Sequence, residues 1–172
     1  MKSRKIPDKA LIPKPITKST EILTHLHSGQ LLRVYGRRGS ALIICHAHHA
    51  ELAGPGSAVG SIFDLDCRRV IPVGSPALVY PQTRDQRLKA FAIRQQWIFF
   101  TQKAMESYVP LQRARAILTL LERYFTPEIV NQIPDDVVSQ LVGVLPKTLQ
   151  MARQATKPQS EITQQPSERV EV

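Results

Sequence analysis

Glycine is distributed unevenly along this chain, and that distribution constrains the fold more than any other feature. Seven of the eight glycines lie between residues 29 and 74, whereas residues 85–142 contain none. Glycine marks turns between short elements, and long stretches of helix formers without glycine favour helices. We therefore expect a β-rich first part and a helical second part, which together define an α+β protein.

Short apolar runs separated by turn residues fill the first part. Residues 31–35 and 41–45 flank a glycine-bearing turn at 36–40, a pattern typical of a β-hairpin. Residues 20–27 favour one or two helical turns. A second turn is expected at 54–56, with short strands at 61–63, 70–71 and 75–80. Short strands with frequent turns predict a small barrel or sandwich, here a β-roll over residues 21–84.

A long helix is expected over residues 85–108. Its apolar side chains include a series with a spacing of seven and three neighbours near the same side: Phe91, Ile98 and Met105, with Leu88, Ala92 and Tyr108. Such a stripe is typical of a helix that pairs with a copy of itself, and also of a helix packed on its own domain. Three heptads do not distinguish the two. Residues 85–109 are assigned to a linking helix, with a homodimer as the favoured expectation.

Residues 110–156 predict a further helix and then two short helices joined at Gly143. Pro110 suits the first turn of a helix over 110–125. In residues 134–153, apolar positions fall where a helix-turn-helix buries its inner side: Val137, Val138, Leu141, Val144, Thr148 and Leu149. Ser139 is small enough for two helices to approach closely. This pattern favours a DNA-binding helix-turn-helix.

The chain is strongly basic, with 23 Lys and Arg against 14 Asp and Glu and a formal net charge of +9. Most of the excess lies in residues 1–20 and 84–123. A basic excess favours an anionic partner, with nucleic acid first, although a basic protein without such a partner remains the alternative. Residues 1–20 predict a flexible basic arm, and residues 157–172 predict a disordered tail because they are polar and contain few apolar residues.

Cysteine content and hydropathy favour a cytoplasmic location. Cys45 and Cys67 do not make a disulfide framework in a chain of 172 residues, and we expect buried, inert thiols. The N-terminus lacks the apolar region of an export signal. Apolar runs are no longer than a strand, far below the roughly 18 residues of a membrane span, so no membrane partner is expected.

The order of elements and several motifs resemble the cyclic-AMP receptor protein (Crp/Fnr-type) family of bacterial transcription regulators. Residues 29–35 (GQLLRVY) resemble the family's first hairpin, and residues 52–66 (LAGPGSAVGSIFDLD) resemble its turn and nucleotide-binding cassette. Residues 110–125 and 133–153 resemble the helix before the DNA-binding unit and that unit itself. The resemblance covers residues 28–153. It implies a dimeric DNA-binding regulator with a cyclic-nucleotide-binding-like β-roll, a long helix and a C-terminal helix-turn-helix.

The effector pocket that this resemblance implies is degenerate. In the family a glutamate after a glycine binds the ribose, and an Arg-Ser pair binds the phosphate. Here Ser61 follows Gly60, and a serine cannot replace a carboxylate that accepts through two oxygens. Arg68 and Arg69 are positioned to meet a phosphate, but no Ser or Thr follows them. We expect a weak effector pocket at these four residues, no cyclic AMP binding and no cofactor.

The reading face of the last helix also departs from the family. Aligned on Gly143, residues 146–151 (PKTLQM) stand where the family has Arg-Glu-Thr-x-x-Arg, so the guanine-binding arginine is missing. The family's β-wing is not expected in the polar residues that follow. DNA contacts should then be mostly electrostatic. The residues expected to make them are Lys147, Thr148, Gln150, Arg153, Arg113 and Arg115.

The resemblance and the charge together predict a transcription regulator that binds double-stranded DNA. The alternative is a protein-interaction module of the same fold that docks on RNA polymerase or another regulator without reading DNA. No nucleophile, base and orienting group come together in the sequence, so we do not expect an enzyme.

Two other clusters carry candidate chemistry. The run His46-Ala-His-His49 offers imidazoles, and His46 and His48 would share one face of a strand. Its spacing fits no structural zinc pattern, so we expect loop or strand-edge histidines and no metal site. Asp64 and Asp66 are expected in a surface ion pair or turn beside the arginines that follow.

Overall fold

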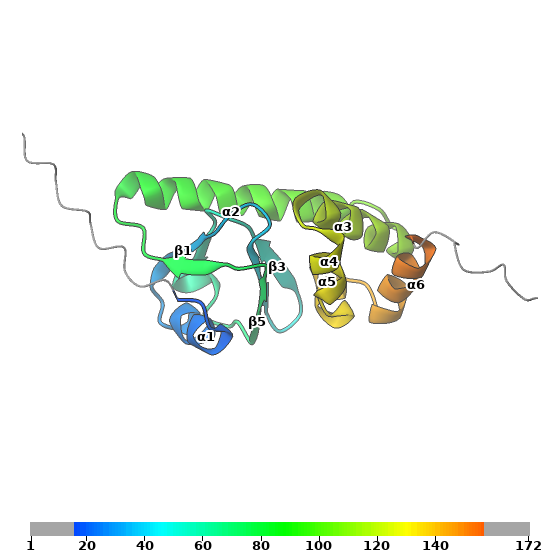
Figure 1. Ribbon diagram of the computed structural model, residues 1–172, viewed down its shortest axis with the longest axis horizontal. Coiled ribbons are helices and arrows are strands. Elements are labelled where there is room, and N and C mark those ends of the chain that lie inside the picture. Colours follow the sequence, from blue (N-terminus) through cyan, green and yellow to red (C-terminus); the bar gives the residue numbers. More distant parts are fainter. Residues whose placement is uncertain (1–15, 157–172) are drawn as a thin grey trace, which may run out of the picture.

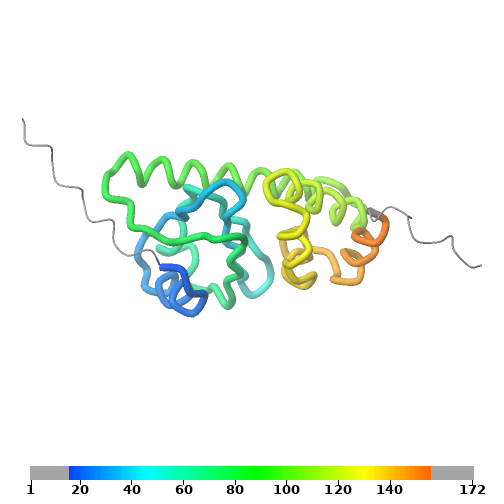
Figure 2. Tube along the Cα trace, viewed as in Figure 1, coloured from blue at the N-terminus to red at the C-terminus, as the bar shows by residue number. Residues whose placement is uncertain are grey.

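The computed structural model describes residues 16–156 (Figures 1 and 2). The described residues do not include most of the predicted basic arm or the predicted tail. They also end before the position that a wing would occupy, after residue 156. The elements are α1 (Ser19–His27), β1 (Leu31–Tyr35), β2 (Ala41–Cys45), β3 (Ala50–Ala53), β4 (Ala58–Gly60), the 3-10 helix η1 (Ser61–Phe63), β5 (Arg69–Val73), β6 (Ala77–Val79), α2 (Arg84–Ala104), α3 (Pro110–Tyr124), α4 (Pro127–Gln132), α5 (Asp135–Leu141) and α6 (Pro146–Thr156). The predicted α+β class is confirmed.

The strands form two small antiparallel sheets within the described residues. One sheet has the order β4-β1-β6 and the other β3-β2-β5. In the second sheet Leu42 lies opposite Ala53 of β3 and Pro72 of β5. The predicted hairpin of residues 31–45 is therefore wrong, because its two strands, β1 and β2, pair with other strands and lie at the centres of different sheets.

Strand β2 is buried on both faces, which explains its uninterrupted apolar sequence. Leu42 and Ile44 pack in a core between the two sheets and α1. Ala41, Ile43 and Cys45 point the other way, into a second core shared with α2 and the C-terminal helices. The β part and the helical part therefore share one apolar core.

Helix α2 runs along the β part and reaches the C-terminal helices (Figure 1). Its first turn is capped by Thr83, whose hydroxyl accepts from the Gln86 amide at 3.1 Å. Trp97 lies on its buried face and packs over Gly54, where a Cβ atom would meet the indole ring at 2.1 Å. Gly54 thus allows the sheet and α2 to approach closely.

The apolar residues spaced seven apart along residues 91–105 do not lie on this buried face of α2. The buried positions are Ala90, Arg94, Trp97, Thr101 and Ala104. Phe91 and Ile98 are half-buried at the edge of that face, and Phe91 contacts the Phe63 ring edge-on. Packing within the chain therefore accounts for part of the series, and a homodimer stays a prediction.

A further local expectation, the strand at 61–63, is wrong. Residues 61–63 form a 3-10 turn instead of a strand, because Gly60 (φ 78°) and Ser61 (φ 56°) turn the backbone out of the extended region. Residues 46–49 form a loop, one of the two expected alternatives, closed by the His46 amide donating to the His49 carbonyl at 2.8 Å. His46 and His48 therefore do not share a strand face.

Candidate functional site

The α5–α6 unit is the candidate for a nucleic-acid interface. Its two short helices meet at Gly143, whose φ of 59° lies in the left-handed region that favours glycine. The Val144 amide donates to the Ser139 carbonyl at 3.1 Å, and the Ser139 hydroxyl donates to the Asp136 carbonyl at 2.9 Å. Ser139 is buried between these elements, so a small residue is required there.

Helix α6 has one buried and one exposed side. Leu149 and Ala152 are fully buried, and α6 packs on α3. The exposed side carries Lys147, Gln150 and Met151, with Thr148 half-buried at its edge. Lys147 forms no ion pair with any described residue. This side of α6 is therefore mostly polar and accessible, with one charge and one exposed methionine.

Arg153 does not lie on that accessible side, although the sequence suggested a DNA contact for it. Its Nε donates to Asp135 Oδ1 at 2.8 Å, and its Nη1 donates to Asn131 Oδ1 at 3.3 Å. Its Nη2 donates to the carbonyls of Val130 and Ile133, each at 3.2 Å. The guanidinium is thus engaged inside the protein, where it ties α6 to the α4–α5 junction.

Replacing Arg153 with alanine should lower the free energy of unfolding by about 1–3 kcal/mol, because charged hydrogen bonds to partly buried groups are lost. Urea denaturation measures the change. Arg123→Ala, at an exposed position of α3, is the control and should cost less than about 0.5 kcal/mol. Equal losses in the two variants would contradict the clamping role of Arg153.

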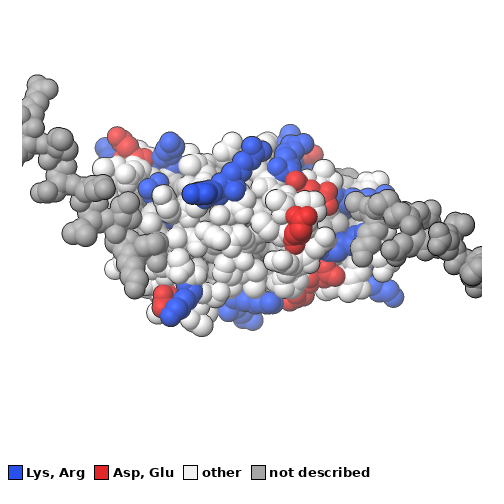
Figure 3. Space-filling view, viewed as in Figure 1, with Lys and Arg blue, Asp and Glu red and all other residues white. Residues whose placement is uncertain are grey.

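The other two predicted DNA contacts lie on α3. Arg115 is exposed, whereas Arg113 is half-buried and its Nε has no hydrogen-bond partner among the described residues. On the face drawn in Figure 3, basic side chains lie in separate groups with acidic ones between them. The charge excess therefore forms no single continuous patch on that face.

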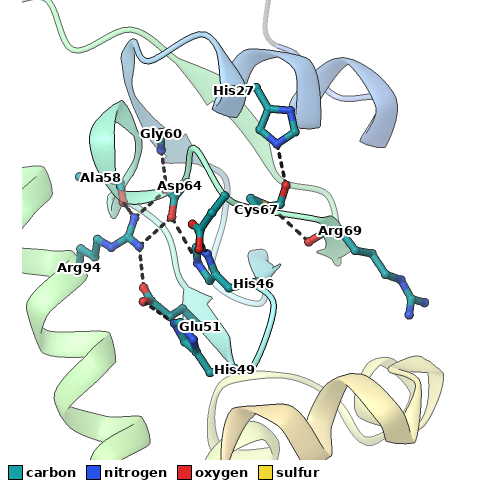
Figure 4. Close-up of polar contacts among 11 residues, drawn as sticks. His27, His46, His49, Glu51, Ala58, Gly60, Asp64, Cys67, Arg69 and Arg94 are labelled. Carbon is teal, nitrogen blue, oxygen red and sulfur yellow. Dashed lines mark hydrogen bonds and ion pairs between the residues drawn. The ribbon is translucent and has the colours of Figure 1, made fainter.

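The four residues of the expected effector pocket are not brought together. The Gly60 amide donates to Asp64 Oδ2 at 2.6 Å, so Gly60 belongs to the turn after β4. The Arg69 side chain points away from Gly60 (Figure 4) and donates to Asp136 of α5 at 3.0 Å. Ser61 is half-buried and Arg68 is exposed. No arginine of this set lies beside Gly60 to hold a phosphate.

A buried ion network built on Arg94 lies behind that turn instead (Figure 4). The guanidinium donates to Asp64 at 2.8 and 2.9 Å, to Glu51 at 2.5 Å and to the Ala58 carbonyl at 3.2 Å. Burial alone would lower the pKa of Arg94, but the two carboxylates hold it above its ordinary value. Arg94 therefore stays charged inside the protein.

Sequence reasoning missed this network. It counted Arg94 among the positive charges of residues 84–123 and placed Asp64 at the surface. Asp64 lies in a turn, one of the two expected alternatives, but it is fully buried, so a surface ion pair is wrong for it. The available signal was spacing, because Arg94 lies four residues after Ala90 and three before Trp97 on the buried side of α2.

A second polar cluster surrounds the turn between β2 and β3. His46 is buried, and its Nδ1 lies 2.8 Å from Asp66 Oδ1. This hydrogen bond lowers the pKa of Asp66. The rings of His46 and His49 stack with centroids 4.6 Å apart, and His49 Nε2 lies 3.4 Å from Glu51 Oε1. His46, His49 and Glu51 offer three ligand atoms that all lie within 4.8 Å of one another.

Both cysteines are buried and free, as expected from the sequence. Burial raises the pKa of Cys67 to about 11 and also raises the pKa of Cys45. A protonated thiol is a poor nucleophile. Neither cysteine is therefore suited to nucleophilic catalysis.

Comparison of the chain with protein-family models, curated proteins and solved structures found no match. Among the described residues, none of the helices combines the length and apolar character needed to cross a bilayer.

Proposed function

We propose that the protein is a DNA-binding transcription regulator of the Crp/Fnr type, with α5–α6 as its helix-turn-helix and α6 as the recognition helix. The observation that carries this proposal is the exposed polar side of α6 beside a tight turn at Gly143. In helix-turn-helix proteins the second helix lies in the major groove and its first residues meet the bases. Lys147 and Gln150 occupy that part of α6.

The β part serves, in this proposal, as an effector domain that does not bind cyclic AMP. Arg94 and its carboxylate partners fill the space behind the Gly60 turn, whereas the Gly60 amide binds Asp64, Arg69 binds Asp136 and Arg68 is exposed. A pair of copies, joined through α2, would present two α6 helices to half-sites about one DNA turn apart.

Combining Lys147→Ala with Gln150→Ala should weaken duplex binding and reduce the slope of log affinity against log salt by about 1, because one phosphate contact is lost. Fluorescence anisotropy at several salt concentrations measures both quantities. Lys89→Ala with Gln95→Ala, at exposed positions of α2, is the matched control and should leave the slope unchanged. Identical slopes for the two double variants would argue against α6 as the contact.

A protein-interaction module is the second candidate, and one observation favours it. Leu145, just before α6, is 72% exposed, and Met151, on the exposed side of α6, is 52% exposed. Phosphate contacts at these positions would need polar groups. Exposed apolar side chains are typical of protein-binding surfaces. If duplex DNA is not retarded in a gel even at low salt, this candidate replaces the DNA-binding proposal.

A further inference from the structure

We propose that His46, His49 and Glu51 bind a divalent transition-metal ion of the zinc type. Imidazole nitrogen and carboxylate oxygen are common ligands of zinc, and three protein ligands leave a fourth position open. The three side chains are brought together by one hairpin, because His46 follows β2, His49 precedes β3 and Glu51 lies in β3. The site does not depend on whether α6 binds DNA.

His46 is prepared as a ligand by its surroundings. Its side chain is 3% exposed, and Nδ1 is hydrogen-bonded to Asp66 at 2.8 Å. In the neutral ring this bond places the proton on Nδ1 and leaves a lone pair on Nε2. Orientation of a ligand histidine by a carboxylate is a recurrent feature of metal sites.

The Nε2 atom of His46 is buried and has no hydrogen-bond partner among the described residues. Asp64 Oδ1 lies 3.7 Å away, beyond hydrogen-bond distance, and a carboxylate oxygen cannot donate to a lone pair. A buried polar atom without a partner destabilises the fold. A metal ion would satisfy this atom.

Charge around the cluster also favours a cation. Glu51 Oε2 is held by Arg94, while Oε1 faces His49. The three carboxylates of Glu51, Asp64 and Asp66 and the single guanidinium of Arg94 leave two negative charges when both histidines are neutral. A divalent ion balances that charge.

Coordination needs the His49 ring to turn out of its stack with His46, because rings at an interplanar angle of 11° do not direct both in-plane lone pairs at one ion. Ligand atoms around a tetrahedral zinc lie about 3.3 Å apart, as follows from zinc–ligand distances of about 2.0–2.2 Å. The three atoms here lie within 4.8 Å of one another. His49 has a side chain that is 57% exposed, so its rotation closes the difference.

The site opens into a hollow of about 270 Å³ that His49 and Glu51 share with Ile98 of α2, with Met105 just after that helix and with Gly143. An ion held there would lie beside the α5–α6 turn and keep an open position for water or an anion. Figure 4 shows His49 and Glu51 next to each other, with His46 nearby.

Calorimetric titration of the full, chelator-treated protein with zinc chloride tests the proposal. We expect one zinc per chain, with affinity lowered more than tenfold by His49→Ala and about 10–100-fold by Asp66→Asn, since the latter removes the orienting carboxylate. His48→Ala is the matched control, because His48 lies in the same turn but outside the ligand group. Its affinity should equal that of the unaltered chain.

Two results would overturn the site. The first is an unaltered chain that takes up no zinc. Zinc bound equally by the His48→Ala and His49→Ala variants would place the ion elsewhere, for example at the histidines of α1. Circular dichroism of each variant shows that a lost site is not a lost fold.

Discussion

Replacing Arg94 with methionine should lower the free energy of unfolding by about 3–5 kcal/mol, because removing one partner of a buried ion pair leaves the other charge uncompensated. Asp64 is fully buried, and its two oxygens accept from Arg94 and from the Gly60 amide. Methionine fills similar space but neutralises neither Asp64 nor Glu51. The midpoint of urea denaturation, with an unchanged slope, measures the loss.

Two further variants separate this effect from a general loss of charge on α2. Arg87→Met, at an exposed position of the same helix, should change stability by less than about 0.5 kcal/mol. Adding Asp64→Asn to Arg94→Met should recover part of the loss, since an amide carries no charge to bury. If Arg94→Met costs no more than Arg87→Met, the network does not stabilise the fold.

Shortening Leu149 to alanine should cost about 2–5 kcal/mol, the range for a buried leucine whose removal leaves a cavity. Leu149 is fully buried where α6 packs on α3, in the same core as Ile117 and Leu121. The variant should also lose DNA binding at temperatures where α6 detaches. Thermal unfolding followed by circular dichroism measures the first effect, and anisotropy measures the second.

Met151→Ala is the control for Leu149→Ala because Met151 lies on the same helix and is 52% exposed. We expect its stability to stay within about 0.5 kcal/mol of the unaltered chain. A similar loss in the two variants would mean that α6 is not anchored through Leu149.

Local patterns predicted the elements well, because the signals involved are short-range. The apolar run at 41–45 predicted β2, and Pro110 and Gly143 marked the beginning of α3 and the turn after α5. Most of the strand pairing was not predictable, since β1 pairs with β4 and β6 and β2 pairs with β5, all distant in sequence, and only β3 is a neighbour of β2 along the chain. The turn at 61–63 was missed because Ser61 adopts a positive φ, which is uncommon for any residue but glycine.

The polar clusters could not be predicted for a related reason. Arg94 meets Asp64 and Glu51 across 30 and 43 residues of sequence, and no local pattern encodes such contacts. The sequence suggested a DNA contact for Arg153. Nothing in the sequence of its own helix reveals that it binds the carbonyls of Val130 and Ile133. Among the histidines, the turn at 46–49 stacks the ring of His46 on that of His49 instead of that of His48.

Selection from a library of random-sequence duplexes tests the central claim, that α6 reads DNA, most directly. The unaltered chain should enrich a short motif, and the variant with Lys147→Ala and Gln150→Ala should lose or change it, while Lys89→Ala with Gln95→Ala retains it. Bound duplexes without any enriched motif, or the same motif recovered with the α6 variant, would contradict the claim.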